Sequence, residues 1–153
     1  MRDSSLLTED VRARIGSTGP AAAVAITPRA VERTMDVYLG HHRRAFEPGD
    51  IVPGYVLVAL QAEVDNIGFP DLLPNSVLVS NEFSLERPLR LGEELTVQSR
   101  LADVSERLGG RFGYGLYVRT ETEYRDPAGG VIARMSQTLM YYDAADAREE
   151  GEQ

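Results

Sequence analysis

Ile51-Val-Pro-Gly-Tyr-Val-Leu-Val-Ala-Leu60 places a Pro-Gly pair directly before a run of apolar residues. The apolar side chains recur at helical spacing, so this part of the chain predicts a short helix from near Pro53 to about Asn66. The helix is apolar on almost every side. Such a helix must be covered by other elements, because little of its surface suits water.

A sheet that can cover this helix follows later in the chain. Leu85-Glu-Arg-Pro-Leu-Arg-Leu-Gly-Glu-Glu-Leu-Thr-Val97 predicts a strand interrupted by a proline and a Gly-containing turn, after which an alternating strand resumes. Strand-like segments bounded by turn residues span residues 77–85, 95–104, 113–124 and 131–142. Residues 108–111 and 126–130 predict hairpin connections. These segments predict an α+β architecture, with a long antiparallel sheet wrapped round a central helix.

Earlier in the chain, residues 21–26 predict a further strand. Thr27 is a good helix N-cap and Pro28 suits the first helical position, while Gly40 is a plausible end for that helix. We find no repeat and no linker, so the chain is read as one domain over residues 15–143. Residues 1–14 are expected to form a flexible segment or a short helix, and residues 144–153 an acidic, disordered tail.

Composition limits the class of protein. The 153 residues are 42% hydrophobic, enough for one globular domain with a core. No stretch reaches the roughly 18 to 20 apolar residues that span a bilayer, and the amino terminus lacks the apolar region of a secretory signal. The chain has no cysteine, which is compatible with a reducing compartment. We therefore expect a cytoplasmic protein that does not insert into membranes.

Charge and residue usage exclude several kinds of chemistry. All 16 basic residues are arginine, so a Schiff-base lysine and a P-loop lysine are both excluded. A net charge of −8 argues against nucleic-acid binding, which needs a basic surface. The only histidines are the adjacent His41 and His42, too few for a multi-histidine metal site without carboxylates. We expect neither a metal nor a cofactor.

Four motifs follow one another along the chain. They are Arg14-Ile-Gly16 before the first strand, the Pro-Gly stretch 51–57, the interrupted strand 83–95 and the hairpin 121–131. In this order and spacing the chain resembles the MaoC-like hydratase/dehydratase branch of the hotdog superfamily, particularly its fatty-acid-synthase-like dehydratase subgroup. The resemblance implies a single hotdog domain.

The same resemblance implies a substrate and a partner. The expected substrate is an enoyl or (R)-3-hydroxyacyl thioester, carried on coenzyme A or an acyl carrier protein, in fatty-acid or polyketide metabolism. The amide of Gly54 would point at the thioester carbonyl, with Tyr55 beside it in the substrate site. A dimer is expected, formed either with a second copy or with another hotdog subunit.

The catalytic loop departs from the family pattern. MaoC-type hydratases carry Gly-Asp-x-Asn-Pro-x-His after the first helix, and its Asp and His form the acid/base pair. Here the corresponding loop reads Gly40-His-His-Arg-Arg-Ala-Phe46. Aligned from the glycine, His41 stands where Asp is expected and Phe46 where His is expected. A weaker resemblance to FabZ-like acyl-carrier-protein dehydratases places Ala59 where their glutamate is expected, with Glu63 one turn later.

The candidate catalytic residues are therefore displaced from both family patterns. His41 or His42 can serve as a general base, because imidazole titrates near neutral pH; the alternative is a solvated polar loop. Asp50 can supply a carboxylate close to the acyl site, or it can cap a helix. Arg43 and Arg44 are candidates for binding the phosphates of the carrier.

Two other functions remain open. The chain can be a non-catalytic hotdog subunit that pairs with an active MaoC-like partner, as the missing acid/base pair suggests. It can also be an acyl-CoA thioesterase in which Glu63, near Gln61 on the central helix, activates water or attacks the thioester. A salt bridge at a dimer interface is the structural alternative for Glu63.

Overall fold

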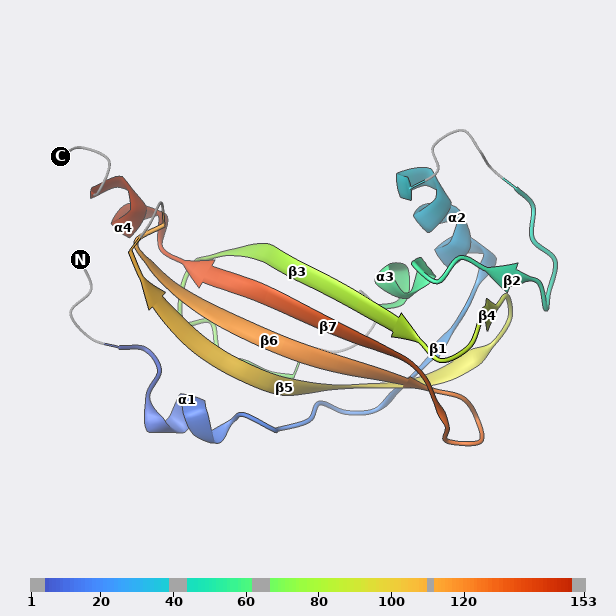
Figure 1. The fold of residues 1–153 in the computed structure, drawn as a ribbon, viewed down its shortest axis with the longest axis horizontal. Coiled ribbons are helices and arrows are strands. Elements are labelled where there is room, and N and C mark those ends of the chain that lie inside the picture. The colour runs from blue at the N-terminus through green and yellow to red at the C-terminus, as the bar shows by residue number, and fades with distance from the viewer. Residues whose placement is uncertain (1–4, 39–43, 62–66, 110–111, 150–153) are drawn as a thin grey trace.

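The computed structural model describes residues 5–38, 44–61, 67–109 and 112–149. Its main element is a curved five-stranded sheet with the order β1-β5-β6-β7-β3, in which every neighbouring pair is antiparallel (Figure 1). Helices α2 and α3 lie at one end of this sheet, and α1 and α4 lie at the other. The strands are β1 (Ala22–Ala25), β3 (Asn75–Leu85), β5 (Glu94–Leu108), β6 (Tyr114–Arg125) and β7 (Val131–Tyr142).

The long strands follow the alternation of apolar and polar residues along the sequence. In the first half of β5 Leu95 and Val97 are buried while Thr96 and Gln98 are exposed, as expected when successive side chains point to opposite faces. The predicted strands 77–85, 95–104, 113–124 and 131–142 all lie within β3, β5, β6 and β7, apart from Gly113. Irregular pairing near Val79 of β3 and Ala102 of β5 marks a bulge in each strand.

The interrupted strand is also confirmed. After β3 ends at Leu85, Leu89–Arg90 forms the short strand β4, and the chain turns at Gly92, which has a φ of 91°, before β5 begins. Strand β4 pairs with β2 (Ile51–Val52), in a separate two-stranded sheet. Sequence analysis missed the strand β2, because two residues are too few to show a period.

Helix α2 (Pro28–Tyr38) begins where the sequence predicts. The hydroxyl of Thr27 accepts a hydrogen bond from the amide of Ala30 at 3.2 Å, and Pro28 occupies the first helical position. The helix buries Val31 and Met35. Its predicted end at Gly40 lies outside the described residues.

Helix α3 (Val56–Gln61) is the central helix that the sequence predicts, but it begins later than expected. Residues 53–55 form a turn in which the amides of Val56 and Leu57 donate to the carbonyls of Pro53 and Gly54, at 3.1 and 3.3 Å. These bonds span three residues instead of four, so the regular helix starts only at Val56. The predicted continuation over residues 62–66 lies outside the described residues.

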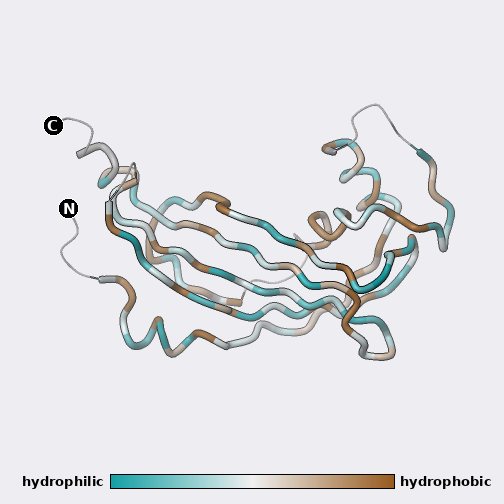
Figure 2. Tube along the Cα trace, in the orientation of Figure 1, coloured by the Kyte–Doolittle hydropathy of each residue, from teal (hydrophilic) through white to brown (hydrophobic). Residues whose placement is uncertain are grey.

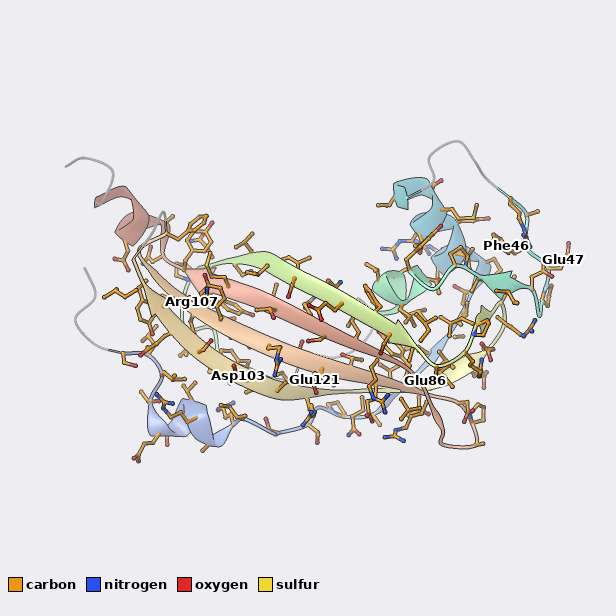
Figure 3. The ribbon with its side chains drawn as sticks, in the orientation of Figure 1. Phe46, Glu47, Glu86, Asp103, Arg107 and Glu121 are labelled. Atoms are coloured by element: carbon orange, nitrogen blue, oxygen red, sulfur yellow. The ribbon has the colours of Figure 1, made fainter. Side chains whose placement is uncertain are left out.

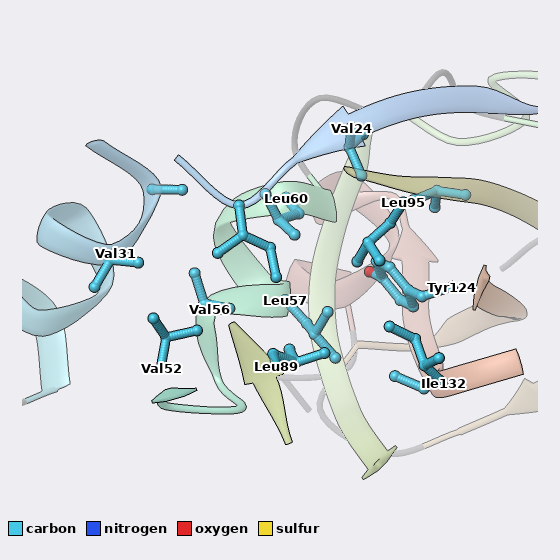
Figure 4. Packing of buried hydrophobic residues seen from close by; sticks show 14 of the residues in the cluster. Val24, Val31, Val52, Val56, Leu57, Leu60, Leu89, Leu95, Tyr124 and Ile132 are labelled. Atoms are coloured by element: carbon cyan, nitrogen blue, oxygen red, sulfur yellow. The ribbon is translucent and has the colours of Figure 1, made fainter. Parts of the chain in front are cut away.

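The core has two parts, one under each end of the sheet. The larger cluster packs α2 and α3 against the sheet, and Figure 4 shows Leu57 and Leu60 of α3 facing the region of Leu95 and Tyr124. The smaller cluster joins Val11 of α1 to strands β5 and β6. Figure 2 shows this division as hydrophobic stretches in α3 and in alternating positions of the strands.

The amino-terminal segment contains a short helix, which is one of the two expectations for it. Residues Glu9–Ala13 form helix α1, whose N-cap Thr8 accepts from the amide of Val11. Upstream, the Ser5 and Tyr114 hydroxyls both bond to the carboxylate of Glu106, which lowers the pKa of that carboxyl. Ser5 and Glu106 are 101 positions apart in the sequence, so no local pattern reveals their contact.

The segment that follows α1 covers one edge of the sheet. The amides of Gly16 and Gly19 donate to the carbonyls of Leu101 and Ser99 at 2.7 and 2.9 Å, and the amide of Leu101 donates back to Ser17. Strand β1 then pairs with residues 94–97 of β5. Backbone groups of β5 that would otherwise face solvent are therefore paired over much of the strand.

A short helix occupies the first part of the predicted carboxyl-terminal tail, and residues 150–153 lie outside the described residues. Residues Ala144–Glu149 form helix α4, and the carboxylate of Asp143 caps it by accepting from the amide of Ala145 at 2.9 Å. The helix approaches β6 closely, since a Cβ added to Gly113 would lie 3.4 Å from the carbonyl oxygen of Asp146. None of the helices in the described ranges is long and apolar enough to cross a membrane.

Candidate functional site

The segment before β2 forms a compact turn around Asp50. The Asp50 carboxylate accepts a hydrogen bond from the amide of Glu47 at 3.0 Å, and the guanidinium of Arg44 lies 3.6 Å from the same oxygen. Two backbone hydrogen bonds attach the turn to the residue after β4. The Gly49 amide donates to the carbonyl of Leu91, and the Leu91 amide donates to the backbone carbonyl of Asp50. One oxygen of the candidate carboxylate is thus already engaged in shaping the turn.

Phe46 occupies the place where the MaoC-like pattern has its catalytic histidine. The ring is partly buried and packs against the larger core cluster. The guanidinium carbon of Arg44 stands 4.6 Å from the ring centre, within the range of a cation–π contact. Figure 3 shows Phe46 and Glu47 at the end of the molecule that carries α2 and α3. This position has therefore taken a packing role.

Arg44 also borders a small cavity against α2. The cavity has a volume of about 220 Å³ and is lined by Glu32, Met35, Asp36, Arg44 and Ala45. Two acidic residues thus lie beside the arginine that was predicted to bind a carrier phosphate. Together with Asp50 they balance its charge, which weakens its attraction for an incoming phosphate.

The Pro-Gly turn leads directly into α3 and packs tightly against the end of β3. A Cβ built on Gly54 would lie 3.0 and 3.1 Å from the two terminal carbons of Leu85, closer than side chains normally approach. The carbonyl of Gly54 accepts from Leu57, whereas its amide makes no hydrogen bond within the described part of the chain. Tyr55, the other predicted substrate contact, is partly buried in the same turn.

On α3, Ala59 is the residue that the predicted FabZ-like resemblance aligns with a glutamate. Ala59 is partly buried and packs against the larger core cluster, so no acid is present at that position. The backbone of Gln61 ends the described part of the helix. The candidates His41, His42, Arg43 and Glu63 all lie outside the described residues.

A cavity larger than the one at Arg44 lies elsewhere, on β5, β6 and β7. It has a volume of about 390 Å³ and contains two arginines that already pair with carboxylates, Arg100 with Glu121 and Arg134 with Glu86. Figure 3 shows Glu121 on the sheet and Glu86 near its end, well away from Phe46. None of the predicted site residues lines this cavity.

Comparison with known families gives the site its context. The model of the family described as "FAS1-like, dehydratase domain region" matches residues 43–135, which include the Asp50 turn, α3 and most of the sheet. The chain belongs to the FAS1-like dehydratase domain family. No curated protein matches the sequence.

Solved structures show that this FAS1-like dehydratase domain has the hotdog fold expected from its sequence. The ChsH1-ChsH2 complex from Mycobacterium tuberculosis contains a similar chain, with a TM-score of 0.65 and 11% identity, covering 89% of this chain and 98% of that one. The MaoC-like dehydratase from Rhodospirillum rubrum gives a TM-score of 0.56 at 14% identity, covering 84% and 92%. The truncated HadBC (3R-hydroxyacyl-ACP dehydratase) complex from Mycobacterium tuberculosis gives 0.54 at 18%, covering 83% and 96%.

The MaoC-like part of the resemblance is therefore confirmed, while the resemblance to FabZ-like dehydratases stays a prediction. In this FAS1-like dehydratase domain the structure brings Arg44 and Asp50 together and packs Gly54 against Leu85. Sequence reasoning missed Leu85, because it is far from Gly54 in the sequence and becomes its neighbour only when the chain folds. Within the described ranges, no group of three His, Asp or Glu residues is placed to hold a metal ion.

Tyr124 of β6 is a buried residue with a polar group. It is fully buried between the sheet and α3, and its hydroxyl has no hydrogen-bond partner among the described residues. Burial raises the pKa of Tyr124 well above its usual range, so the hydroxyl stays protonated. Thr122 lies two residues earlier on the same face of β6. In contrast to the Tyr124 hydroxyl, its hydroxyl forms a hydrogen bond with the hydroxyl of Ser99 on β5, at 2.8 Å.

Tyr124→Phe is expected to raise the free energy of unfolding by about 1 kcal/mol, because it removes a buried hydroxyl without a partner and keeps the ring. Urea denaturation followed by circular dichroism measures the change. Tyr117→Phe, at a partly buried position on the same strand, is the matched control and should change stability little. A clear loss of stability in Tyr124→Phe would contradict the absence of a partner.

Asp50→Ala is expected to lower the free energy of unfolding by about 1 kcal/mol, because the turn loses the acceptor for the amide of Glu47. Asp50→Asn should cost less, since its amide oxygen can still accept that bond while the exposed ion pair with Arg44 contributes little. Urea denaturation of both variants separates the two contributions. Equal losses would show that the charge of Asp50, and not its hydrogen bond, supports the turn.

Proposed function

We propose that this chain acts on acyl thioesters as a hotdog hydratase/dehydratase, adding water to an enoyl thioester or removing it from an (R)-3-hydroxyacyl thioester. The carrier in this proposal is coenzyme A or an acyl carrier protein. The observation that carries it is the match of residues 43–135 to the FAS1-like dehydratase region. That match spans the turn at Asp50, the Gly54 turn and the sheet on which α3 packs.

The Gly54 amide is proposed to stabilise the reacting thioester. Removal of a proton from the α carbon, or addition of water at the β carbon of the enoyl group, places negative charge on the carbonyl oxygen, and a fixed N–H group directed at that oxygen lowers the barrier. Two observations support this role: the Gly54 amide makes no hydrogen bond within the described part of the chain, and the glycine packs against Leu85. Tyr55 follows in the same turn and is proposed to contact the acyl chain.

The acid/base groups are proposed to be His41 or His42, with Asp50 as a secondary candidate. Hydration requires a base to activate water and an acid to deliver a proton to the α carbon, and imidazole can do both near neutral pH. Asp50 ranks second because one of its oxygens is already bound to the amide of Glu47. Arg43 and Arg44 are proposed to contact the carrier phosphates, with Arg44 the weaker contact because acidic residues surround it.

The purified chain should add water to crotonyl-CoA and to a longer enoyl-CoA, which is followed as loss of the enoyl absorbance. Chromatography of the products identifies the 3-hydroxyacyl thioester and excludes simple hydrolysis. Release of free coenzyme A from a saturated acyl-CoA, without hydration, would instead support a thioesterase that uses Glu63. Absence of both reactions in a folded sample would remove the enzyme proposal.

A second candidate function is a non-catalytic subunit that pairs with an active hotdog chain. Two observations favour it: Phe46 and Ala59 replace the expected catalytic residues with packing side chains, and two similar structures are the ChsH1-ChsH2 and HadBC complexes. For this candidate, the chain alone should be inactive. Activity should appear when a second hotdog chain with an intact Asp and His is added.

A further inference from the structure

One face of strand β3 forms a track that begins at the Gly54 turn. Leu85, Phe83 and Asn81 are alternate residues of β3, so their side chains lie on the same face of the sheet. Gly54 packs against Leu85, and Phe83 packs against the larger core cluster, so this is the face that carries α3. Figure 1 shows the carboxyl end of β3 close to α3. The track therefore runs from the Gly54 turn past Leu85 and Phe83 to Asn81.

The described helices leave this track open. Leu85 is 40% exposed, and Phe83 and Asn81 are only partly buried. The first part of the track is apolar, because it is made of an aliphatic and an aromatic side chain. An alkyl chain that leaves the Gly54 turn along β3 can bury its methylene groups against both of them.

A polar stripe crosses the sheet where the track reaches Asn81. Asn81 pairs with Gln137 of β7, and Gln137 pairs with Thr120 of β6. Residues that pair directly lie on the same face, so these three side chains form one row across three strands, which we call the polar stripe. It separates the two parts of the core, since Met135 on one side belongs to the larger cluster and Val118 on the other side to the smaller.

The polar stripe departs from the usual pattern of a sheet. The face of an antiparallel sheet that carries a helix is normally apolar, and departures from such rules concentrate at functional sites. The side-chain oxygen of Asn81 is buried and accepts no hydrogen bond within the described part of the chain. A buried acceptor without a donor is costly, so a ligand that supplies the donor gains affinity at this position.

The spacing between the Gly54 turn and the polar stripe sets the length of that ligand. Leu85 and Asn81 are four residues apart in an extended strand, which corresponds to about 13 Å. An extended alkyl chain with carbon–carbon bonds of about 1.5 Å covers this distance with roughly ten carbons. A group that reaches Asn81 therefore lies far out on a long acyl chain.

We propose that the polar stripe binds a hydroxyl group on the acyl chain of the substrate, about ten carbons from the thioester. This inference rests on the proposed function, which places the thioester carbonyl at the Gly54 amide. The preferred substrates are then thioesters of hydroxylated long-chain acids. Asn81 determines the specificity, and Thr120 lies in the same row.

The chemistry of the polar stripe selects a hydroxyl over other terminal groups. A carboxamide both donates and accepts hydrogen bonds, and so does a hydroxyl. A methyl end would displace water from Asn81 without replacing its hydrogen bonds, which disfavours a plain fatty acyl chain. A carboxylate end is disfavoured because the polar stripe contains no arginine and the chain carries a net charge of −8.

Binding of saturated thioesters tests this inference without any turnover. The probes are dodecanoyl-pantetheine and ω-hydroxydodecanoyl-pantetheine, because the pantetheine arm is common to coenzyme A and acyl carrier protein. Titration calorimetry of the full chain should give a Kd about ten-fold lower for the hydroxylated probe, the gain expected from hydrogen bonds at a partly buried amide. Hexanoyl and ω-hydroxyhexanoyl probes should differ little, because their ends lie beside Phe83.

Two variants assign the preference to the polar stripe. Asn81→Leu should bind the two dodecanoyl probes equally, and Thr120→Val, which keeps the size of the side chain, should reduce the preference. Ser84→Leu is the control and should keep it, because Ser84 is exposed on the opposite face of β3.

The proposal is overturned by equal binding of the two dodecanoyl probes to the unmodified chain, by an equal preference among the hexanoyl probes, or by a preference that survives in Asn81→Leu. Absence of binding by all four probes also overturns it. Hydration of crotonyl-CoA, whose acyl chain is too short to reach Asn81, tests the proposed function separately. Failure of one proposal is therefore distinguishable from failure of the other.

Discussion

His41→Ala is expected to slow the hydration of crotonyl-CoA by about 10²- to 10⁴-fold, the contribution usual for a general acid or base. His41 and His42 are the only imidazoles in the chain, so two single variants and the double variant test every histidine. If His41 is the base, His42→Ala should keep most of the activity. The measurement is the initial rate of enoyl absorbance loss at saturating substrate, for each variant and the unmodified chain.

The controls separate an effect of the histidines on catalysis from an effect on folding and from a role of the Asp50 carboxylate. Each variant should unfold at the same urea concentration as the unmodified chain, which shows that a loss of activity is not a loss of folding. Asp50→Asn keeps the turn and removes the charge. Loss of activity in this variant would therefore identify Asp50 as the acid or base. Full activity in the double histidine variant would disprove the imidazole assignment.

Leu60→Ala is expected to lower the free energy of unfolding by about 2 to 5 kcal/mol. Leu60 has no exposed surface and lies in the larger cluster between α3, α2 and the sheet. Truncation removes its buried carbons and leaves a cavity that the surrounding long strands cannot easily fill. Because single domains are typically stable by only about 5 to 15 kcal/mol, this loss is a large part of the total. Urea denaturation of the purified variant gives the value.

Val37→Ala is the matched control for Leu60→Ala. Val37 is 76% exposed on α2, so its truncation should change the free energy of unfolding by less than about 0.5 kcal/mol. A Leu60→Ala loss as small as that of the control would mean that α3 does not pack in the core as described. Hydration activity of the Leu60 variant, measured below its unfolding transition, then tells whether the position of α3 also affects the Gly54 turn.

Sequence reasoning worked best where a local pattern determines the structure. Thr27 and Pro28 define the start of α2 by themselves, because capping and the fixed φ of proline act within one turn. The strands followed from alternation over many residues. The start of α3 was placed three residues too early, because a Pro-Gly pair suits both a helix start and the tight turn that occurs at residues 53–55.

Features that depend on distant contacts could not be predicted. The carboxylate of Glu106 holds Ser5 through a bond between residues that no sequence period connects. The closeness of Leu85 to Gly54 and the lack of a partner for the Tyr124 hydroxyl likewise depend on how the strands and α3 come together. For the candidate site, the motif order predicted the family, whereas the packing roles of Phe46 and Ala59 required the structure.

The cover that residues 16–25 place over β5 has a consequence for the size of any assembly. A sheet with two long open edges can add chains at both ends and grow into a fibre. Here the β5 side ends in β1, which has only four residues, and the opposite side is β3. Pairing at β3 can therefore join two sheets, but the edge that each chain then leaves open is the short β1, so growth would stop at a pair.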